Sequence, residues 1–294
     1  MKLAIDIGSN TIKCLLGEPE NRRVRVLYEE SLDWRICGGS SALVPDAAEI
    51  ISRAIVHFKI AAKKFSPTFE TVAVATSALR EATERDAVIS AVFGATDEKI
   101  EILSGEDEAR LSYAGAVSGL DNPAPCLYFD LGGGSLELVY GDGRAAQISR
   151  SLKLGAVRLT REFFGDSEPT PETLAKLRAK AEAALRQAAG DFPKIGAVVC
   201  AGGAVVAARL LKKRLLLAGA EDEITLADME LLARLMREST LAERVEKYAI
   251  PPRRADIICA AFETVLVLMR VFGVEKIKHT FFNLRYGIIL SDIK

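Results

Sequence analysis

The chain has 294 residues, of which 49% are hydrophobic and 27% charged, and 39 Lys and Arg residues nearly balance 40 Asp and Glu residues. This length exceeds that of a usual single-core domain, so two domains are expected. A net charge of −1 argues against a nucleic-acid partner, and an anionic substrate would need a local cluster of positive charge. No apolar run approaches the ~20 residues of a membrane span, and the N-terminus lacks a signal segment, so we expect a cytoplasmic protein without a membrane partner.

The cysteine and histidine residues give little support for a metal centre or a disulfide framework. The five cysteines are scattered, lie mostly inside apolar runs and form no CxxC pair, which predicts buried free thiols. The two histidines, His57 and His279, stand far apart in the sequence. A zinc site or a histidine-driven catalytic triad is therefore not expected.

The first half of the chain alternates apolar strands with amphipathic helices. Residues 3–7 and 11–17 predict two strands joined by a turn at Asp6 to Asn10, and residues 24–32 predict a third antiparallel strand. Beyond them we expect helices over 45–65, 86–93 and 104–117 and strands over 70–75 and 99–103. This order predicts an α/β domain.

Polar residues follow two of these strands. Thr76, Ser77 and Arg80 come after the strand 70–75, where ligands of α/β sheets usually bind, although Arg80 fits an ordinary surface position equally well. Ser104 is a natural helix cap, and Glu106, Asp107 and Glu108 follow it. Acids at a helix start are usually capping residues, but one of them beyond a strand end can serve as a general base.

Residues 119–125 contain two prolines and an asparagine and form the best linker in the chain. We therefore predict two domains, residues 1–121 and 122–294. In the second domain the pattern predicts strands over 126–131, 136–141, 146–152, 195–200 and 276–280, and helices over 155–164, 169–187, 205–211, 226–238, 241–247, 256–271 and 283–290.

The second domain opens with an acid and a glycine-rich turn between two apolar strands. Gly132, Gly133 and Gly134 allow an anion to approach successive backbone N–H groups, and Asp130 can hold a cation that binds the anion. A plain hairpin with a loose turn is the alternative. Gly202 and Gly203, between a strand and a helix, form another backbone-donor site for a phosphate or nucleotide.

The glycine-rich turn has a counterpart near the N-terminus. Aligned on Asp6 and Asp130, the segments DIGSNTIKCLLGE and DLGGGSLELVYGD agree in residue type at nearly every position, over 6–18 and 130–142. Chance similarity of two hairpins is the alternative to a duplication. We expect two duplicated halves that place two phosphate-binding turns on opposite walls of a cleft.

The ordered set of motifs resembles the exopolyphosphatase and guanosine pentaphosphate phosphohydrolase (Ppx/GppA) family. The matching segments are DIGSNT (6–11), ATSALREA (75–82), ILSGEDEARLSYAG (102–115), FDLGGGSLEL (129–138), SLKLGAVRL (151–159), AGGA (201–204) and RADII (254–258). The resemblance implies an α/β fold with two actin-like ATPase (ribonuclease H-like) domains and a cleft between them. It also implies a Mg²⁺-dependent hydrolase that removes a terminal phosphate from polyphosphate or the 5′-terminal phosphate from pppGpp.

The resemblance further implies roles for particular residues. Glu108 corresponds to the catalytic glutamate, Asp130 and Glu137 to the acids that hold the metal and position water, and Arg80 to a phosphate-contacting arginine. Asp6 is a third candidate metal ligand. The candidate phosphate-binding residues are Gly8, Ser9, Asn10, Thr11, Arg80, Gly132, Gly133, Gly134, Ser135, Gly202 and Gly203.

This chain departs from the family pattern at two residues and in length. Leu136 and Ala204 stand where a threonine is usual, and longer relatives carry an additional C-terminal helical domain. Each missing hydroxyl would remove ~1 kcal/mol of binding if it contacted phosphate. We therefore expect a preference for shorter polyphosphate chains.

Four functional hypotheses follow. The first is an exopolyphosphatase, and the second is a pppGpp 5′-phosphohydrolase. A kinase of the same superfold would need ATP and an acceptor, whereas a non-catalytic sensor of polyphosphate or (p)ppGpp would gain nothing from carboxylates that face phosphate. The oligomeric state stays open, with a homodimer as one alternative.

Overall fold

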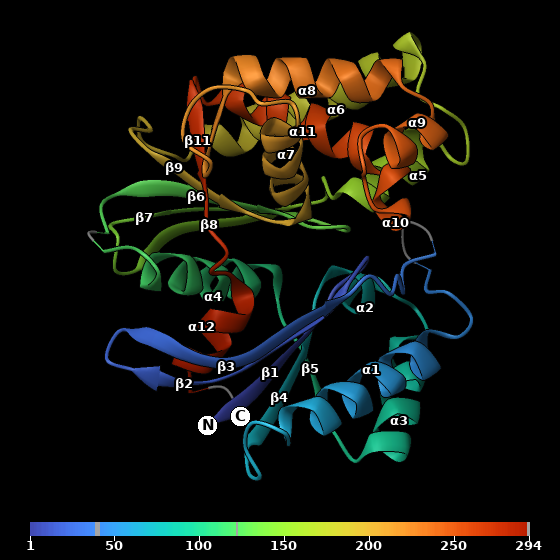
Figure 1. Cartoon of the computed structure of the whole chain (residues 1–294), viewed down its shortest axis with the longest axis vertical. Coiled ribbons are helices and arrows are strands. Elements are labelled where there is room, and N and C mark those ends of the chain that lie inside the picture. The colour runs from blue at the N-terminus through green and yellow to red at the C-terminus, as the bar shows by residue number, and fades with distance from the viewer. Residues whose placement is uncertain (39–41, 122, 293–294) are drawn as a thin grey trace. The chain divides into compact units, whose positions relative to one another are not determined.

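The structure is a computed structural model that describes residues 1–38, 42–121 and 123–292. Internal contacts divide the chain into two compact units, Met1–Pro123 with Phe282–Lys294, and Ala124–Phe281. We call them unit 1 and unit 2. Each unit contains one sheet covered by helices (Figure 1). Position 122, in the predicted linker, lies outside the described residues.

Unit 1 has a five-stranded sheet of order β3-β2-β1-β4-β5. The central strand β1 pairs antiparallel with β2 and parallel with β4. Most of these strands are apolar because the sheet packs against helices. The elements are β1 (Lys2–Ile7), β2 (Ile12–Glu20), β3 (Arg23–Leu32), α1 (Ala47–Ala62), β4 (Glu70–Ala75), α2 (Ser77–Glu81), α3 (Arg85–Thr96), β5 (Ile100–Ile102), α4 (Gly105–Ser118) and α12 (Leu284–Leu290).

Unit 2 has a six-stranded sheet of order β10-β11-β9-β6-β7-β8. Its strands are β6 (Cys126–Leu131), β7 (Leu136–Gly141), β8 (Ala146–Leu152), β9 (Val198–Ala201), β10 (Glu223–Thr225) and β11 (Lys276–His279). Its helices are α5 (Ala156–Phe163), α6 (Pro171–Ala189), α7 (Gly203–Arg214), α8 (Leu226–Glu238), α9 (Leu241–Glu246), α10 (Pro252–Ala255) and α11 (Ile258–Val271). The apolar helix α11 is almost fully buried.

The two units share one topology and one turn geometry. In each, an antiparallel hairpin (β1–β2 or β6–β7) lies beside a parallel strand (β4 or β9). The Gly8 N–H donates to Thr11 O at 3.0 Å, and at the aligned positions the Gly132 N–H donates to Ser135 O at 3.0 Å. The next strand pair has a register shift at Leu16/Gly17 in unit 1 and at the aligned Tyr140/Gly141 in unit 2. The predicted duplication is therefore present in the fold.

The unit boundaries differ from the predicted domains at the C-terminal segment. Residues 282–294 were expected in the second domain, but α12 packs against α4, β1 and β2 of unit 1. The helices α4 and α12 approach closely at two glycines. A Cβ atom on Gly115 would overlap Asn283 O, and one on Gly287 would overlap Leu111 O. The two glycines thus permit the close approach of α12 to α4, while apolar side chains of α12 are buried in a core cluster of unit 1.

Replacing Gly115 by Ala should lower the free energy of unfolding by about 1–3 kcal/mol, because the added methyl group meets backbone that cannot rotate away. Urea denaturation measures this change. Gly94 in α3 is the matched control, since a Cβ there has open space and Ala should stabilise the helix by about 0.5–1 kcal/mol. Equal effects of the two substitutions would contradict the close helix contact.

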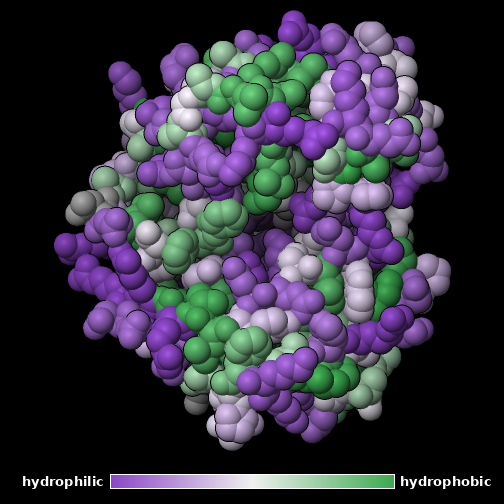
Figure 2. Space-filling view, in the orientation of Figure 1, coloured by the Kyte–Doolittle hydropathy of each residue, from purple (hydrophilic) through white to green (hydrophobic). Residues whose placement is uncertain are grey.

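Three short elements were not predicted, namely α2, α10 and the three-residue strand β10. They are too short for a periodic pattern to develop. All five cysteines are buried thiols, as predicted. Within the described part of the chain, no helix is long and apolar enough to cross a membrane. On the face shown in Figure 2, hydrophilic residues surround scattered hydrophobic patches.

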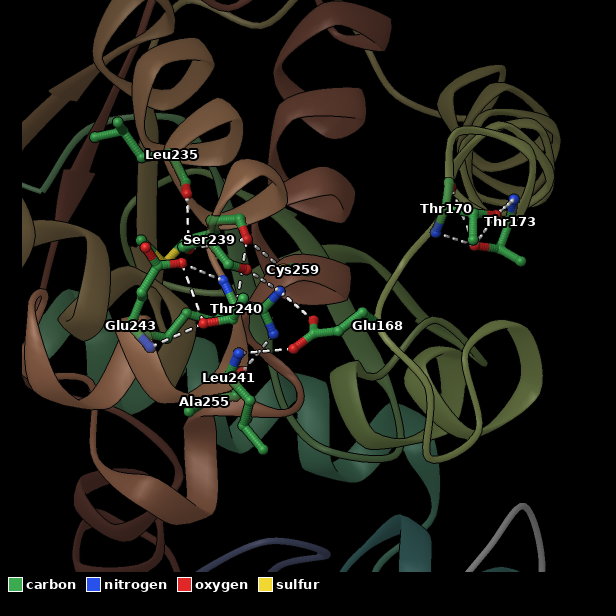
Figure 3. A network of polar contacts seen from close by, with 12 residues as sticks. Glu168, Thr170, Thr173, Leu235, Ser239, Thr240, Leu241, Glu243, Ala255 and Cys259 are labelled. Carbon is green, nitrogen blue, oxygen red and sulfur yellow. Dashed lines mark hydrogen bonds and ion pairs between the residues drawn. The ribbon is translucent and has the colours of Figure 1, made fainter.

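A buried arginine, Arg244, joins several segments of unit 2. Its partners Glu168, Ser239 and Ala255 belong to the polar network shown in Figure 3. The Arg244 side chain donates to Glu168 Oε2 at 2.6 Å and to the carbonyl oxygens of Ser239 at 2.8 Å, Met236 at 3.1 Å and Ala255 at 3.2 Å. These acceptors belong to the segment before α6, to the end of α8 and to α10. Arg244 therefore fixes the position of α10 within unit 2.

Candidate active site

Two predicted acids of unit 2 lie side by side on the sheet. Asp130 near the end of β6 pairs directly with Glu137 near the start of β7, so both side chains point from the same face. Glu137 is 2% exposed and accepts a hydrogen bond from Ser151 Oγ at 2.9 Å. Tyr128 Oη donates to Asp130 Oδ2 at 3.3 Å. Burial, together with the charges of Asp130 and Glu137, raises the pKa of Tyr128 well above its usual value, so its phenol remains a donor.

Helix α5 orients the glycine-rich turn. The N–H of Ala156 donates to Gly132 O at 3.0 Å, and the N–H of Val157 donates to Gly133 O at 2.9 Å. Arg158 Nε donates to Gly134 O at 2.8 Å. Because the C=O and N–H of a trans peptide point in opposite directions, the N–H groups of the three residues after Gly132 are directed away from α5. Successive N–H groups on one side of a turn are the arrangement that binds anions.

Two further glycines permit close packing around this turn. A Cβ on Gly155 would overlap the backbone of Gly133 and Gly134, so α5 can begin only at a glycine. Gly202 adopts a φ of 100°, and a Cβ there would lie 2.7 Å from Asp130 Oδ1. The turn after β9 therefore lies directly against Asp130 and brings the predicted Gly202 into the same neighbourhood.

Arg254 on α10 is a neighbour to which sequence analysis gave no role. Its guanidinium occupies the space that a Cβ on Gly203 would fill. The RADII motif contains Arg254, but nothing in the sequence pattern indicates which segment it contacts. A second such neighbour is Arg158, which is buried next to the glycine-rich turn.

Unit 1 brings Glu108 and Arg80 together. Strands β4 and β5 are adjacent and parallel, so α2 after β4 and α4 after β5 begin at the same edge of the sheet. Arg80 Nη1 donates to Glu108 Oε2 at 2.9 Å and to Leu103 O at 3.0 Å. Glu108 is 8% exposed, and the Arg80 side chain is 21% exposed. Arg80 is thus an ion-paired, mostly buried residue instead of an open surface arginine.

The three consecutive acids at the start of α4 have different environments. Ser104 Oγ accepts a hydrogen bond from the Asp107 N–H at 3.1 Å, as predicted for a helix cap. The hydrogen bond from Ser104 and the ion pair with Arg110 lower the pKa of Asp107. Glu106 is exposed, whereas Glu108 is buried. Of the three acids, only Glu108 is directed into the protein.

The first turn of unit 1 places Asp6 opposite Lys13 across β1 and β2. The carbonyl of Ser9 accepts the N–H groups of Ile36 and Cys37, at 3.2 and 3.1 Å. Asn10 Oδ1 accepts a hydrogen bond from Arg35 Nε at 2.7 Å, a contact that sequence analysis missed. Ser9, Asn10 and Thr11 are buried. This turn therefore has cationic neighbours, Lys13 and Arg35, where the aligned turn of unit 2 has the carboxylate of Glu137.

Replacing Asp6 by Asn should raise the free energy of unfolding at pH 7 in the absence of divalent cations. Burial raises the pKa of Asp6, against the opposing effects of Lys13 and Arg285. The Asp6 carboxyl therefore binds its proton more tightly in the folded state than in the unfolded state. As a result, the free energy of unfolding falls as the pH rises from the ordinary Asp pKa of 3.8 through the raised pKa of the folded state. Urea denaturation at pH 4 and pH 7 measures the difference, and a variant that is less stable at pH 7 would contradict this account.

The side chains proposed to hold a metal ion are carboxylates, which offer oxygen ligands. Among the described residues, no group of three or more His, Cys, Asp or Glu side chains is placed to hold a metal ion. Asp130 and Glu137 form a pair of adjacent carboxylates within unit 2. One or two carboxylates, with water and phosphate oxygens, are a usual ligand set for Mg²⁺. The pair is therefore compatible with Mg²⁺.

A model of the Ppx/GppA phosphatase family matches residues 21–294. The chain belongs to this family. A relative named exopolyphosphatase 1, from Mycobacterium leprae (strain TN), is 30% identical over 311 residues, which cover 100% of this chain and 90% of the relative. A guanosine-5′-triphosphate,3′-diphosphate pyrophosphatase from Aeromonas salmonicida (strain A449) is 28% identical over 274 residues, which cover 89% of this chain and 54% of the relative. This chain thus spans about half the length of the Aeromonas relative.

Solved structures of the Ppx/GppA family share the fold. A crystal structure of an exopolyphosphatase from Cytophaga hutchinsonii superposes with a TM-score of 0.86 at 18% identity and covers 98% of this chain and 96% of that chain. The predicted fold class, an α/β protein with duplicated actin-like halves, is confirmed. The predicted family is confirmed as well.

Proposed function

We propose that this Ppx/GppA protein is an exopolyphosphatase that releases terminal orthophosphate from inorganic polyphosphate. The observation that carries the proposal is the buried Glu108 carboxylate, held by Arg80 at the edge of the unit 1 sheet. A single oriented carboxylate suits a general base, because its position is fixed before the substrate binds. The similarity to exopolyphosphatase 1 along nearly the whole of both chains supports this substrate.

In the proposed reaction a water molecule attacks the terminal phosphorus atom. The new bond joins the water oxygen to this phosphorus, and the bond from the phosphorus to the bridging oxygen breaks. Glu108 accepts the proton of the attacking water, and the shortened chain leaves with the electron pair of the broken bond. The products are orthophosphate and a polyphosphate chain that is one residue shorter.

Backbone N–H groups would stabilise the charge that spreads over the phosphoryl oxygens. Proposed donors are the residues of the two turns, Gly8 to Thr11 and Gly132 to Ser135, together with Gly202 and Gly203. The hydrogen bonds from α5 to the carbonyls of the unit 2 turn support this role, since they hold the N–H groups of the turn in a fixed direction. Arg80 is a further candidate for contact with phosphate.

Asp130 and Glu137 are the proposed ligands of Mg²⁺, and Asp6 is a third candidate. When bound, Mg²⁺ would supply positive charge to the phosphate oxygens. Asp130 would be oriented by the Tyr128 hydroxyl, and Glu137 by Ser151. Both acids are thus held by side chains of the same sheet, which supports a role in which their positions matter.

The two residues that depart from the family pattern, Leu136 and Ala204, are both buried. Leu136 has no exposed surface, and Ala204 is 7% exposed. Leu136 pairs with Leu131 in the sheet, so its side chain belongs to the packed interior. The expected preference for shorter chains stays a prediction that rates on polyphosphate of defined lengths would test.

Hydrolysis of pppGpp is the second candidate, supported by the similarity to the Aeromonas pyrophosphatase over 89% of this chain. Phosphate release from polyphosphate, pppGpp and ATP, measured side by side with and without Mg²⁺, tests both. We expect the fastest release from polyphosphate and a loss of this release with EDTA. Faster release from pppGpp would favour the second candidate, and a requirement for an acceptor would indicate a kinase instead.

A further inference from the structure

Four arginines from three helices of unit 2 line an open groove of about 510 Å³. We call it the arginine groove. Helices α6, α8 and α11 pack side by side and provide its walls (Figure 1). Its lining residues are Arg178, Ala227, Glu230, Leu231, Arg234, Arg237, Leu266 and Arg270. None of these residues belongs to the motifs or turns to which the proposed catalytic roles are assigned.

A buried carboxylate orients two of the arginines. Glu263 on α11 has no exposed surface, and its two oxygens accept hydrogen bonds from Arg178 Nε at 2.7 Å and Arg237 Nη1 at 2.6 Å. A guanidinium has five N–H donors, so each of these two arginines retains donors beyond the one that Glu263 uses. Because Glu263 already holds both guanidinium groups in place, the binding of a ligand costs little additional side-chain entropy at these two arginines.

The other two arginines are available to a ligand. Arg270 forms an exposed ion pair with Glu230 at 2.7 Å, which a stronger anion can replace at little cost. No hydrogen-bond or ion-pair partner for the Arg234 side chain occurs among residues 1–38, 42–121 and 123–292. The four arginines carry four positive charges against the two negative charges of Glu230 and Glu263. The groove therefore has an excess of two positive charges in a chain whose net charge is −1.

We propose that the arginine groove is a second binding site for a phosphate chain, separate from the catalytic residues. Guanidinium groups match phosphate oxygens in a bidentate geometry, and they do so more specifically than lysine ammonium groups. A site with several guanidinium groups and an excess of two charges favours a short multivalent anion over a single carboxylate. The phosphate chain can come from inorganic polyphosphate or from a nucleotide. The proposal does not rest on the proposed function, because binding can be measured without hydrolysis.

Protection from phenylglyoxal, a reagent that modifies exposed arginines, tests the site directly. Inorganic tripolyphosphate, ATP and NaCl at matched ionic strength are added to the full chain in a buffer without divalent cations, and modification of Arg234 is followed by mass spectrometry. We expect tripolyphosphate and ATP to slow modification of Arg234 at least about fivefold relative to NaCl, with no change at the exposed Arg186. Protection by tripolyphosphate alone would assign the site to inorganic polyphosphate, and protection by ATP alone would assign it to a nucleotide. Equal protection by NaCl would overturn the proposal.

A variant provides the second measurement. Arg234→Gln should weaken tripolyphosphate binding at one class of sites about tenfold, as expected for the loss of a charge-assisted hydrogen bond. Arg186→Gln on α6 is the matched control, because Arg186 lies outside the arginine groove and forms an exposed ion pair with the neighbouring Glu182. Calorimetric titration of both variants in the same buffer measures the affinity. An unchanged isotherm for Arg234→Gln would overturn the proposal, since this side chain has no partner in the described part of the chain whose loss could alter the fold.

Discussion

Replacing Glu108 by Gln is expected to lower the rate of orthophosphate release by ~10²-fold or more while polyphosphate still binds. Gln keeps the size of the side chain and can still accept the hydrogen bond from Arg80, but it cannot take a proton from water. The proposed role is therefore removed with little change in packing. Initial rates and binding isotherms on the same preparation separate the two effects.

The matched control for this substitution is Glu106→Gln. Glu106 lies in the same first turn of α4 and is exposed, so its replacement should change the rate less than about twofold. A wild-type rate in the Glu108 variant would remove this residue from the mechanism. Equal losses in both variants would point to damage to α4 instead of to the loss of a base.

Replacing Arg244 by Met should lower the free energy of unfolding by about 3 kcal/mol, which is the largest effect on stability that we expect. The buried guanidinium donates to three backbone carbonyls and to Glu168. Removing one partner of a buried charged network leaves the other groups without compensation and typically costs several kcal/mol. Glu168 is half exposed and can be hydrated again, which limits the loss.

Arg186→Met is the control for this prediction, since the exposed ion pair of Arg186 with Glu182 should contribute less than about 1 kcal/mol. Urea denaturation of both variants gives the comparison. A change below about 1 kcal/mol for Arg244→Met would show that the network contributes little. The substitution should also disturb the candidate active site, because Arg244 holds α10, and α10 carries Arg254, which packs on Gly203.

The duplication could be predicted from sequence because it resides in local pattern. Asp6 and Asp130, each followed by a glycine turn and an apolar strand, predicted two matching hairpins, and the structure repeats even the turn hydrogen bond and the irregularity before the next glycine. Most helices and strands were likewise predicted within a few residues, since their periodicity extends over many positions.

Other features depend on contacts between segments that are distant in the sequence, so they could not be predicted from residue patterns. The close contact of α12 with α4 depends on Gly115 and Gly287, and nothing in the sequence distinguishes these two glycines from others in predicted helices. Arg35 reaches Asn10 from a segment without a regular pattern, and Arg254 reaches Gly203 from a helix of four residues. Neither contact has a sequence pattern of its own.

The sequence also left the role of Arg80 undecided between a ligand contact and a surface position. Its ion pair with Glu108 arises because two adjacent parallel strands deliver α2 and α4 to one edge of the sheet. That arrangement is a property of strand order, which residue patterns alone do not specify. The roles of Glu108, Asp130 and Glu137 in catalysis stay predictions that mutation must test.

The most direct test of the central claim is hydrolysis of inorganic polyphosphate in ¹⁸O-labelled water, with Mg²⁺ and without any acceptor. We expect orthophosphate that carries one ¹⁸O atom from the attacking water, released at a rate that falls ~10²-fold or more in the Glu108→Gln variant. Phosphate release that requires an acceptor, or labelled release at an equal rate in that variant, would contradict it.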